Sequence, residues 1–231
     1  MLVLIILNNR LDSLSTTNNE EPTKKRQPKN QTMKRKIIIA SGSESRKTLI
    51  ESIGFNFIFE KSEYEEDMSE RLPAIKLVQK LALGKAQNVA QKHKDAIIIG
   101  ADTFGVINNK FIGQARSPEE AKKILKRLSG KKHKVITGIA IIDTQKNKVI
   151  TDYDISEIWF RNVSDKEIDS YVKTKEPLFK ASAYAIQKLG SVFIEKINGN
   201  QMSIVGLPMQ KIYTHLLKLD VNLLESKYHI K

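Results

Sequence analysis

Asp102 is the residue whose type and position point most directly to chemistry. It follows the apolar run Ala96–Gly100, which predicts a buried strand, and it lies between small residues. Ligands of open α/β sheets bind beyond the carboxyl ends of the strands. A carboxylate at such a place can hold a divalent metal or orient a water molecule. The structural alternative is that Asp102 caps a helix or completes a turn.

Ser41, Ser43 and Arg46 follow another apolar run, Lys36–Ala40, in the same way. That run predicts a parallel-type strand, and helical spacing begins at Arg46, so the unit is a strand, a small-residue loop and a helix. Two hydroxyls and a guanidinium near a helix N-terminus can bind a phosphate. The alternative is that these residues simply cap the helix.

Other candidate groups carry no functional signal in their spacing alone. Glu65 and Glu66 belong to an acidic run, which is usually a solvated face, and Lys85 lies in a helix of alternating charge. The four histidines lack metal-ligand spacing. The sequence contains neither G-x-x-x-x-G-K-[ST] nor G-x-G-x-x-G nor G-x-S-x-G, which counts against P-loop NTPases, Rossmann dehydrogenases and the usual hydrolase elbow.

Strands and helices interleave along the chain, which indicates an α/β or α+β class. Longer helices are predicted over residues 73–93 and from Ser117 to about Gly130, and shorter ones over 164–173 and 209–217. Further strands are predicted over residues 55–59, 134–143 and 191–197, and one long strand or two in a row over 148–160. These elements must position the candidate residues.

Charge and composition limit the classes of protein to which this chain can belong. The 39 basic and 26 acidic side chains give a net charge of +13, which favours nucleic acid, anionic membrane or free nucleotides as partners. The absence of cysteine excludes disulfide scaffolds, iron–sulfur clusters, Cys-ligated zinc and cysteine nucleophiles. Only the charge supports a nucleic-acid binder, because aromatic residues make up 6% and no binding motif is present.

The chain ends are expected to lie outside the domain. Residues 1–35 are predicted to be a disordered basic extension, with seven Lys and Arg against three Asp and Glu. Its apolar start is too short to span a bilayer and does not fit a secretory signal. One alternative is that Met33 is the biological start or that the tail has no role. The other is that the tail is a targeting or polyanion-binding extension. The domain is predicted over 36–220 and a polar tail over 221–231, in a cytoplasmic protein without a membrane span.

Six segments resemble motifs of the Maf family of nucleoside triphosphate pyrophosphatases, also called septum formation proteins. They occur in the family's order between about Lys36 and Leu219: ASGS with Arg46, LALGKA at 81–86, GADT at 100–103, SGKKHKV with TG at 129–138, EP, KA, AY and IQ within 176–187, and NG with VGLP at 198–208. The resemblance implies a single elongated α/β domain of the Maf and ITPase type. Such a domain has a mixed central sheet and a cleft between two lobes.

The resemblance also implies an activity and a cofactor. The family hydrolyses a nucleoside triphosphate to the monophosphate and pyrophosphate with a divalent metal cation, Mg²⁺ or Mn²⁺. Water attacks the α-phosphorus, so the catalytic task is to position groups and neutralise charge. Homodimers are common in the family. No specific nucleic acid is expected as a partner.

Individual roles follow by the same resemblance. Asp102 and Glu66 would hold the metal, and Asp102 would alternatively activate the water. Lys85 and Arg46 would stabilise phosphate charge, with Ser41 and Ser43 helping to bind it. Thr103 and Gln187 match positions associated with pyrimidine choice and resemble the branch that acts on dTTP and UTP.

Several positions depart from the family pattern. Glu44-Ser45 replaces Pro-Arg after the first strand, and Gln114 replaces a lysine expected to touch the nucleotide, for which Lys110 and Arg116 are the candidate substitutes. Phe179 and Ser182 replace an Asp and a Gly. Two alternatives follow: a catalytically weak Maf-like protein with a regulatory role in cell division, and a pyrophosphatase of the 7-methyl-GTP type.

Overall fold

A computed structural model describes residues 35–67 and 72–230, and within them seven strands form one mixed sheet. The strand order is β2-β1-β3-β5-β6-β7, and β4 pairs with the end of β3. The first three strands are parallel and the later pairings are antiparallel, which confirms the mixed sheet. The strands are β1 (Lys36–Ala40), β2 (Ile58–Glu60), β3 (Ala96–Ile107), β4 (Lys110–Phe111), β5 (Lys132–Asp143), β6 (Lys148–Phe160) and β7 (Ile194–Asn198).

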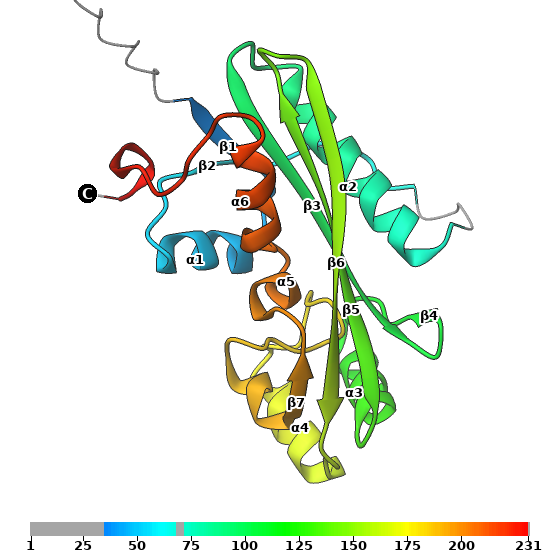
Figure 1. Cartoon of the computed structure of the whole chain (residues 1–231). Helices are drawn as coiled ribbons and strands as arrows, with labels where there is room; N and C mark the ends of the chain where they lie inside the picture. The colour runs from blue at the N-terminus through cyan, green and yellow to red at the C-terminus, as the bar shows by residue number, and fades with distance from the viewer. Residues whose placement is uncertain (1–34, 68–71, 231) are drawn as a thin grey trace, which may run out of the picture. The chain divides into compact units, whose positions relative to one another are not determined.

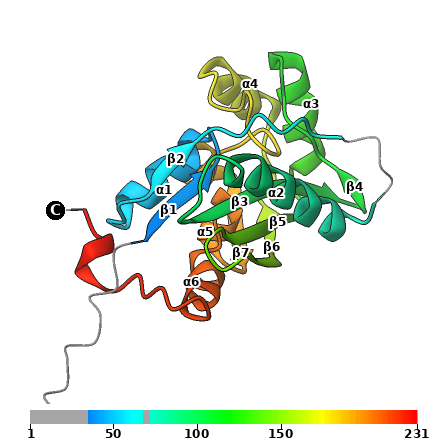
Figure 2. The same cartoon turned by 90° about the horizontal axis from the view of Figure 1, so that it is seen from above.

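Six α-helices connect and cover these strands in the described residues. Helix α2 packs against one face of the sheet, and α1 and α6 pack against the other (Figures 1 and 2). None of the helices in residues 35–67 and 72–230 is long and apolar enough to cross a bilayer. The helices are α1 (Glu44–Ser52), α2 (Ala74–Ala90), α3 (Pro118–Leu128), α4 (Asp165–Lys173), α5 (Gln201–Val205) and α6 (Met209–Leu217).

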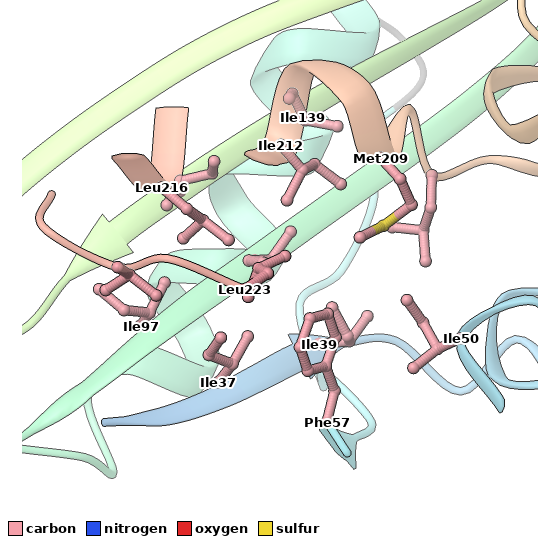
Figure 3. Packing of buried hydrophobic residues seen from close by; sticks show 14 of the residues in the cluster. Ile37, Ile39, Ile50, Phe57, Ile97, Ile139, Met209, Ile212, Leu216 and Leu223 are labelled. Atoms are coloured by element: carbon pink, nitrogen blue, oxygen red, sulfur yellow. The ribbon is translucent and has the colours of Figure 1, made fainter. Parts of the chain in front are cut away.

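The apolar runs of β1 and β3 are continuous because both faces of these strands are covered. Side chains alternate between the faces along a strand. Ile38 and Ile98 therefore pack under α2, whereas Ile37 and Ile97 join the cluster beneath α6 (Figure 3). The same alternation continues along β3 and decides which face each polar residue of that strand reaches.

Two glycines let α2 lie directly on the sheet. A Cβ atom at Gly100 of β3 would be 2.1 Å from the carbonyl oxygen of Ala82, and one at Gly138 of β5 would be 2.5 Å from the backbone of Val78. Any larger residue would push the helix away from these strands. The close contact fixes the height of Lys85, one turn further along α2, above β3.

A second core lies at the other end of the long strands, where α3 and α4 pack side by side around Phe160 and Phe193 (Figure 1). The first core continues past residue 220, since Val221, Leu223 and Tyr228 are buried in it. The segment taken from the sequence as a polar tail therefore contributes to the packing. Residues 1–34, the predicted basic extension apart from its last residue, lie outside the described part.

Candidate active site

A cavity of about 660 Å³ opens at an unpaired edge of β3. Strand β1 pairs with β3 only as far as Ile99, and β4 pairs with it only from Val106. Asp102 and Thr103 lie between these limits. The sequence suggested a strand end near Gly100, but β3 runs on to Ile107 because β5 pairs with it throughout. Asp102 is thus a mid-strand residue beyond the carboxyl end of the neighbouring strand β1.

Asp102 shares its face of the sheet with Ile98, so its side chain points toward α2 and meets Lys85. The Lys85 ammonium lies 2.5 Å from Asp102 Oδ1 and 2.7 Å from Glu66 Oε1. The Asp102 side chain is 10% exposed and that of Glu66 is 42% exposed. The second oxygen of Asp102, Oδ2, is buried and has no hydrogen-bond partner. The structure therefore brings the three predicted catalytic residues together, with the Lys85 ammonium between the two carboxylates.

Thr103 points to the opposite face of β3 and meets the buried guanidinium of Arg46. That group donates to Ser41 Oγ at 3.0 Å, to the Gly206 carbonyl at 2.9 Å and to Thr103 Oγ1 at 3.2 Å. Burial lowers the pKa of Arg46, and the charges of Asp102 and Glu66 partly oppose this. Arginine still stays protonated, so Arg46 places a fixed positive charge beside the cavity.

The hydrogen bonds around Arg46 determine which neighbouring hydroxyls donate and which accept. Thr137 donates to the Ser203 carbonyl at 2.7 Å, so Thr103, 3.0 Å from Thr137 Oγ1, donates to it and accepts from Arg46. Ser41 accepts from Arg46 and from the Ser43 amide. Ser43 is the N-cap residue of α1 but its side chain makes no capping hydrogen bond, and it lines the cavity. Simple helix capping does not account for this group.

A family model described as Maf-like protein matches residues 36–219 of this chain. The chain belongs to the Maf family. A dTTP/UTP pyrophosphatase of Bacillus cereus strain B4264 is 42% identical over 188 residues, which are 81% of this chain and 97% of the relative. Proteins of the same name from Bacillus anthracis and from Bacillus thuringiensis subsp. konkukian strain 97-27 show the same identity and coverage.

The cavity of this Maf protein has two walls of different construction. We call the first the β3 wall; it comprises residues 42–46, Glu66, Lys85 and residues 102–105. We call the second the loop wall; it comprises residues 113–116 and 179–187. The two parts of the loop wall are joined by backbone hydrogen bonds from Phe179 to Ala115 at 2.9 Å and from Ser182 to Gly113 at 3.0 Å. Gln187 lines the cavity from this wall, apart from the other predicted residues.

Most of the departures from the family pattern fall on the loop wall. Ser182 adopts a φ of 66°, a left-handed conformation that suits the family's glycine better than an L-residue. Its hydroxyl is buried without a hydrogen-bond partner. Gln114 and Arg116 both line the cavity, whereas Lys110 lies in β4 and does not. Of the two candidate substitutes for the family's lysine, Arg116 is therefore the one at the site.

Two further features of the loop wall were given no role in the sequence analysis. Lys180 extends toward the β3 wall and its ammonium lies 3.4 Å from Ser45 Oγ. Tyr184 lines the cavity, and its hydroxyl is 2.9 Å from Nε2 of the buried His133. Burial lowers the pKa of His133 to about 4, so the ring is neutral at pH 7. Lys180, Tyr184 and His133 lie in family-like segments, but nothing in their spacing marked them as a group.

The acidic residues suit a divalent cation shared with a substrate. In residues 35–67 and 72–230 no cluster of three or more His, Asp and Glu side chains is arranged to hold a metal alone. Asp102 and Glu66 nevertheless converge on one cation, the Lys85 ammonium, and Asp102 Oδ2 is a buried acceptor without a partner. Mg²⁺ is commonly held by one or two carboxylates together with substrate phosphates. The donor set fits that arrangement.

Proposed function

We propose that this protein hydrolyses dTTP and UTP to the nucleoside monophosphate and pyrophosphate. The observation that carries the proposal is the cavity at the β3 edge, where two carboxylates and two fixed cations, Lys85 and Arg46, stand together. Relatives named dTTP/UTP pyrophosphatase, 42% identical over 97% of their length, support the substrate class. A nucleoside triphosphate needs positive charge for its phosphates and a carboxylate for the attacking water.

The chemistry divides among residues of the β3 wall. Water attacks the α-phosphorus, the bond between that phosphorus and the α–β bridging oxygen breaks, and pyrophosphate leaves. Asp102 orients the water and accepts its proton, because Oδ2 is free of other hydrogen bonds while Oδ1 is held by Lys85. Arg46 and Lys85 stabilise the negative charge of the phosphates. Since Ser41, Thr103 and Gly206 hold the guanidinium, it needs little reorganisation during the reaction.

The metal belongs to this proposal as well. Asp102 and Glu66 would hold Mg²⁺ or Mn²⁺, and the ion would supply Lewis-acid neutralisation of the phosphate charge. Lys85, which contacts both carboxylates, would neutralise phosphate charge beside them.

Base selection is assigned to Gln187 and, indirectly, to Thr103. The Gln187 side chain lines the cavity and offers one donor and one acceptor, which match O4 and N3–H of uracil and thymine. The hydroxyl hydrogen of Thr103 is already used by Thr137, so Thr103 acts by holding Arg46 rather than by donating to a base. The homodimer, the cytoplasmic location and the role in septum formation stay predictions.

The test is pyrophosphate release by the purified full-length protein from dTTP, UTP, CTP, GTP and 7-methyl-GTP, each with Mg²⁺ or Mn²⁺. We expect release from dTTP and UTP above the others and a loss of about 10³-fold in Asp102→Asn. Asp95→Asn is the matched control, because Asp95 lies just before β3 but is exposed and outside the cavity.

Other results would redirect the assignment. Preference for 7-methyl-GTP would contradict the role given to Gln187 and support the other branch of the family. No release from any nucleotide by a folded protein would refute the enzymatic proposal. The catalytically weak, regulatory alternative would then stand.

A further inference from the structure

Helix α5 is the support on which the Arg46 guanidinium is held. Arg46 Nε donates at 2.9 Å to the carbonyl of Gly206, the residue that ends α5. The guanidinium also donates to Thr103. Thr103 in turn donates to Thr137, and Thr137 donates to the Ser203 carbonyl within α5 at 2.7 Å. Two of the three hydrogen bonds of the guanidinium therefore depend on where the carbonyl groups of α5 and its C-cap residue lie.

Helix α5 depends on its neighbours for its position. It has only five residues, and a helix of little more than one turn is not stable alone. It packs on β5 and β6 and contacts α1, so the strands beneath it decide where it lies (Figure 1). Ile204 and Val205 of α5 line the cavity. A shift of this helix would therefore change the site directly.

A row of polar side chains on one face of the sheet holds α5. In the strand register, Thr103 of β3 lies beside Thr137 of β5, and Thr137 lies beside Asp154 of β6. Asp154 Oδ2 accepts a hydrogen bond from the Ser203 hydroxyl. Ser203 is 1% exposed and is held at two points, by Thr137 at its carbonyl and by Asp154 at its hydroxyl.

The Asp154 carboxylate is a strong acceptor in a defined place. Its side chain is 21% exposed, and Oδ1 lies 4.0 Å from the ammonium of Lys211 on α6. A charged acceptor makes a stronger hydrogen bond than a neutral one. Ser156, two residues further along β6, makes the other contact with this segment, because its Oγ accepts from the Asn200 N–H at 3.0 Å. Asp154 is the one that holds the residue whose carbonyl binds Thr137.

We propose that Asp154 is a positioning residue for Arg46. It acts through Ser203, which fixes α5 and the carbonyl groups on which the guanidinium depends. Asp154 itself does not line the cavity, so it has no contact with a substrate there. Only the expected effect on turnover rests on the proposed function, because the position of Arg46 can be measured without substrate.

The first test observes the Arg46 side chain in the substrate-free, full-length protein. Its Nε–H group is buried and bonded to the Gly206 carbonyl, so it should exchange slowly with solvent and give a protected signal in a ¹H–¹⁵N spectrum. Arg46→Lys removes this signal and thereby assigns it. We expect Asp154→Ala to speed the exchange about tenfold or more, because α5 is then held less firmly.

Asp152→Ala is the matched control. Asp152 lies two residues earlier on the same face of β6, and its side chain forms ion pairs with α6 rather than a hydrogen bond with α5. This variant should keep the exchange of the Arg46 signal within about twofold of wild type. Asp154→Asn should keep it within about threefold, because the amide oxygen still accepts from the Ser203 hydroxyl. If Asp154→Ala does not fold, Ser203→Ala removes the same hydrogen bond from its other end.

The second test measures kcat for UTP with Mg²⁺. We expect a loss of about tenfold in Asp154→Ala and no further loss when this substitution is added to Arg46→Lys. A carboxylate that only supports the fold would lower both backgrounds equally.

Three results would each overturn the proposal. They are unchanged exchange of the Arg46 signal in Asp154→Ala, an equal change in Asp152→Ala, and additive losses of kcat in the double variant. If the wild-type protein releases no pyrophosphate while the Arg46 signal responds as expected, the enzymatic function is refuted and the positioning role of Asp154 stands.

Discussion

The two walls of the cavity differ in backbone conformation and in how their polar side chains are held. In the β3 wall, a strand paired along one side and a helix resting on two glycines hold the polar side chains, and Arg46 alone makes three hydrogen bonds. In the loop wall, Phe179, Ser182 and Ala183 all adopt left-handed backbone conformations. Ser182 Oγ is buried there without a hydrogen-bond partner, and so is Nδ1 of His133, which lies on β5 behind this wall.

The difference indicates that the β3 wall performs the chemistry and that the loop wall recognises the substrate. A group held by three hydrogen bonds, such as Arg46, suits the reacting phosphate, where small displacements are costly in rate. The loop wall carries cations and Gln187, which suit recognition of the two ends of the substrate. Unsatisfied polar atoms and strained residues are expected to concentrate at functional sites. Here the left-handed residues lie in the wall that binds, whereas each wall holds one buried polar atom without a partner, Ser182 Oγ in the loop wall and Asp102 Oδ2 in the β3 wall.

The largest expected effect comes from breaking the β3 wall at Lys85. In Lys85→Met the carboxylates of Asp102 and Glu66 lose the cation between them, and the phosphates lose a positive charge. We expect kcat for UTP to fall about 100-fold or more, measured as pyrophosphate release. Lys76→Met, an exposed lysine of the same helix, is the control and should keep wild-type activity. A loss of less than threefold would contradict the role of this wall.

A smaller effect is expected on the pH dependence of stability, and it comes from His133, which lies behind the loop wall. Its pKa of about 4 in the folded protein is below the ordinary value of 6.5, so the unfolded chain takes up the proton first as the pH falls. The free energy of unfolding should therefore decrease by about 2 kcal/mol between pH 7 and pH 4.5 from this group. Urea titrations at both pH values measure it. His133→Gln removes this part of the pH dependence, and an unchanged dependence would show that the ring is not buried and neutral.

The smallest effect tests the strain in the loop wall. Ser182→Gly removes an unsatisfied buried hydroxyl and relieves a φ of 66°, at the cost of a more flexible unfolded chain. We expect the free energy of unfolding to rise by about 1 kcal/mol. Ala183→Gly, with a φ of 59° and no hydroxyl, should gain less. If Ser182→Gly destabilises the protein, its hydroxyl has a partner that offsets the strain.

The same contrast explains what the sequence predicts well. The single strand over 148–160 and the helix over 209–217 match β6 and α6, because the pattern of apolar residues specifies them locally. Asp102 and Lys85 meet through the crossing of α2 over β3, and Glu66 reaches Lys85 from the segment after β2. The family resemblance was sufficient to group the three. The extent of β3 was underestimated, since its continuation depends on pairing with β5. Helix α5 is absent from the sequence analysis, because five residues give too little periodicity.

The loop wall was harder to predict. Gln187 was found through resemblance alone. Lys180 meets Ser45, 135 positions away in the sequence, through a turn built from non-glycine residues with positive φ. Propensity rules assign such residues to other conformations. The pairing of Tyr184 with His133 likewise depends on tertiary packing, because the two residues lie on a loop and on β5.

The measurement that tests the central claim most directly is turnover of UTP in water enriched in ¹⁸O, followed by mass spectrometry of both products. Attack at the α-phosphorus, beside Asp102, places the label in UMP and leaves pyrophosphate unlabelled. Label in pyrophosphate would mean that the β-phosphorus is attacked, and release of orthophosphate would mean that the terminal bond is cleaved. Either result would contradict the placement of the reacting phosphate at the β3 wall.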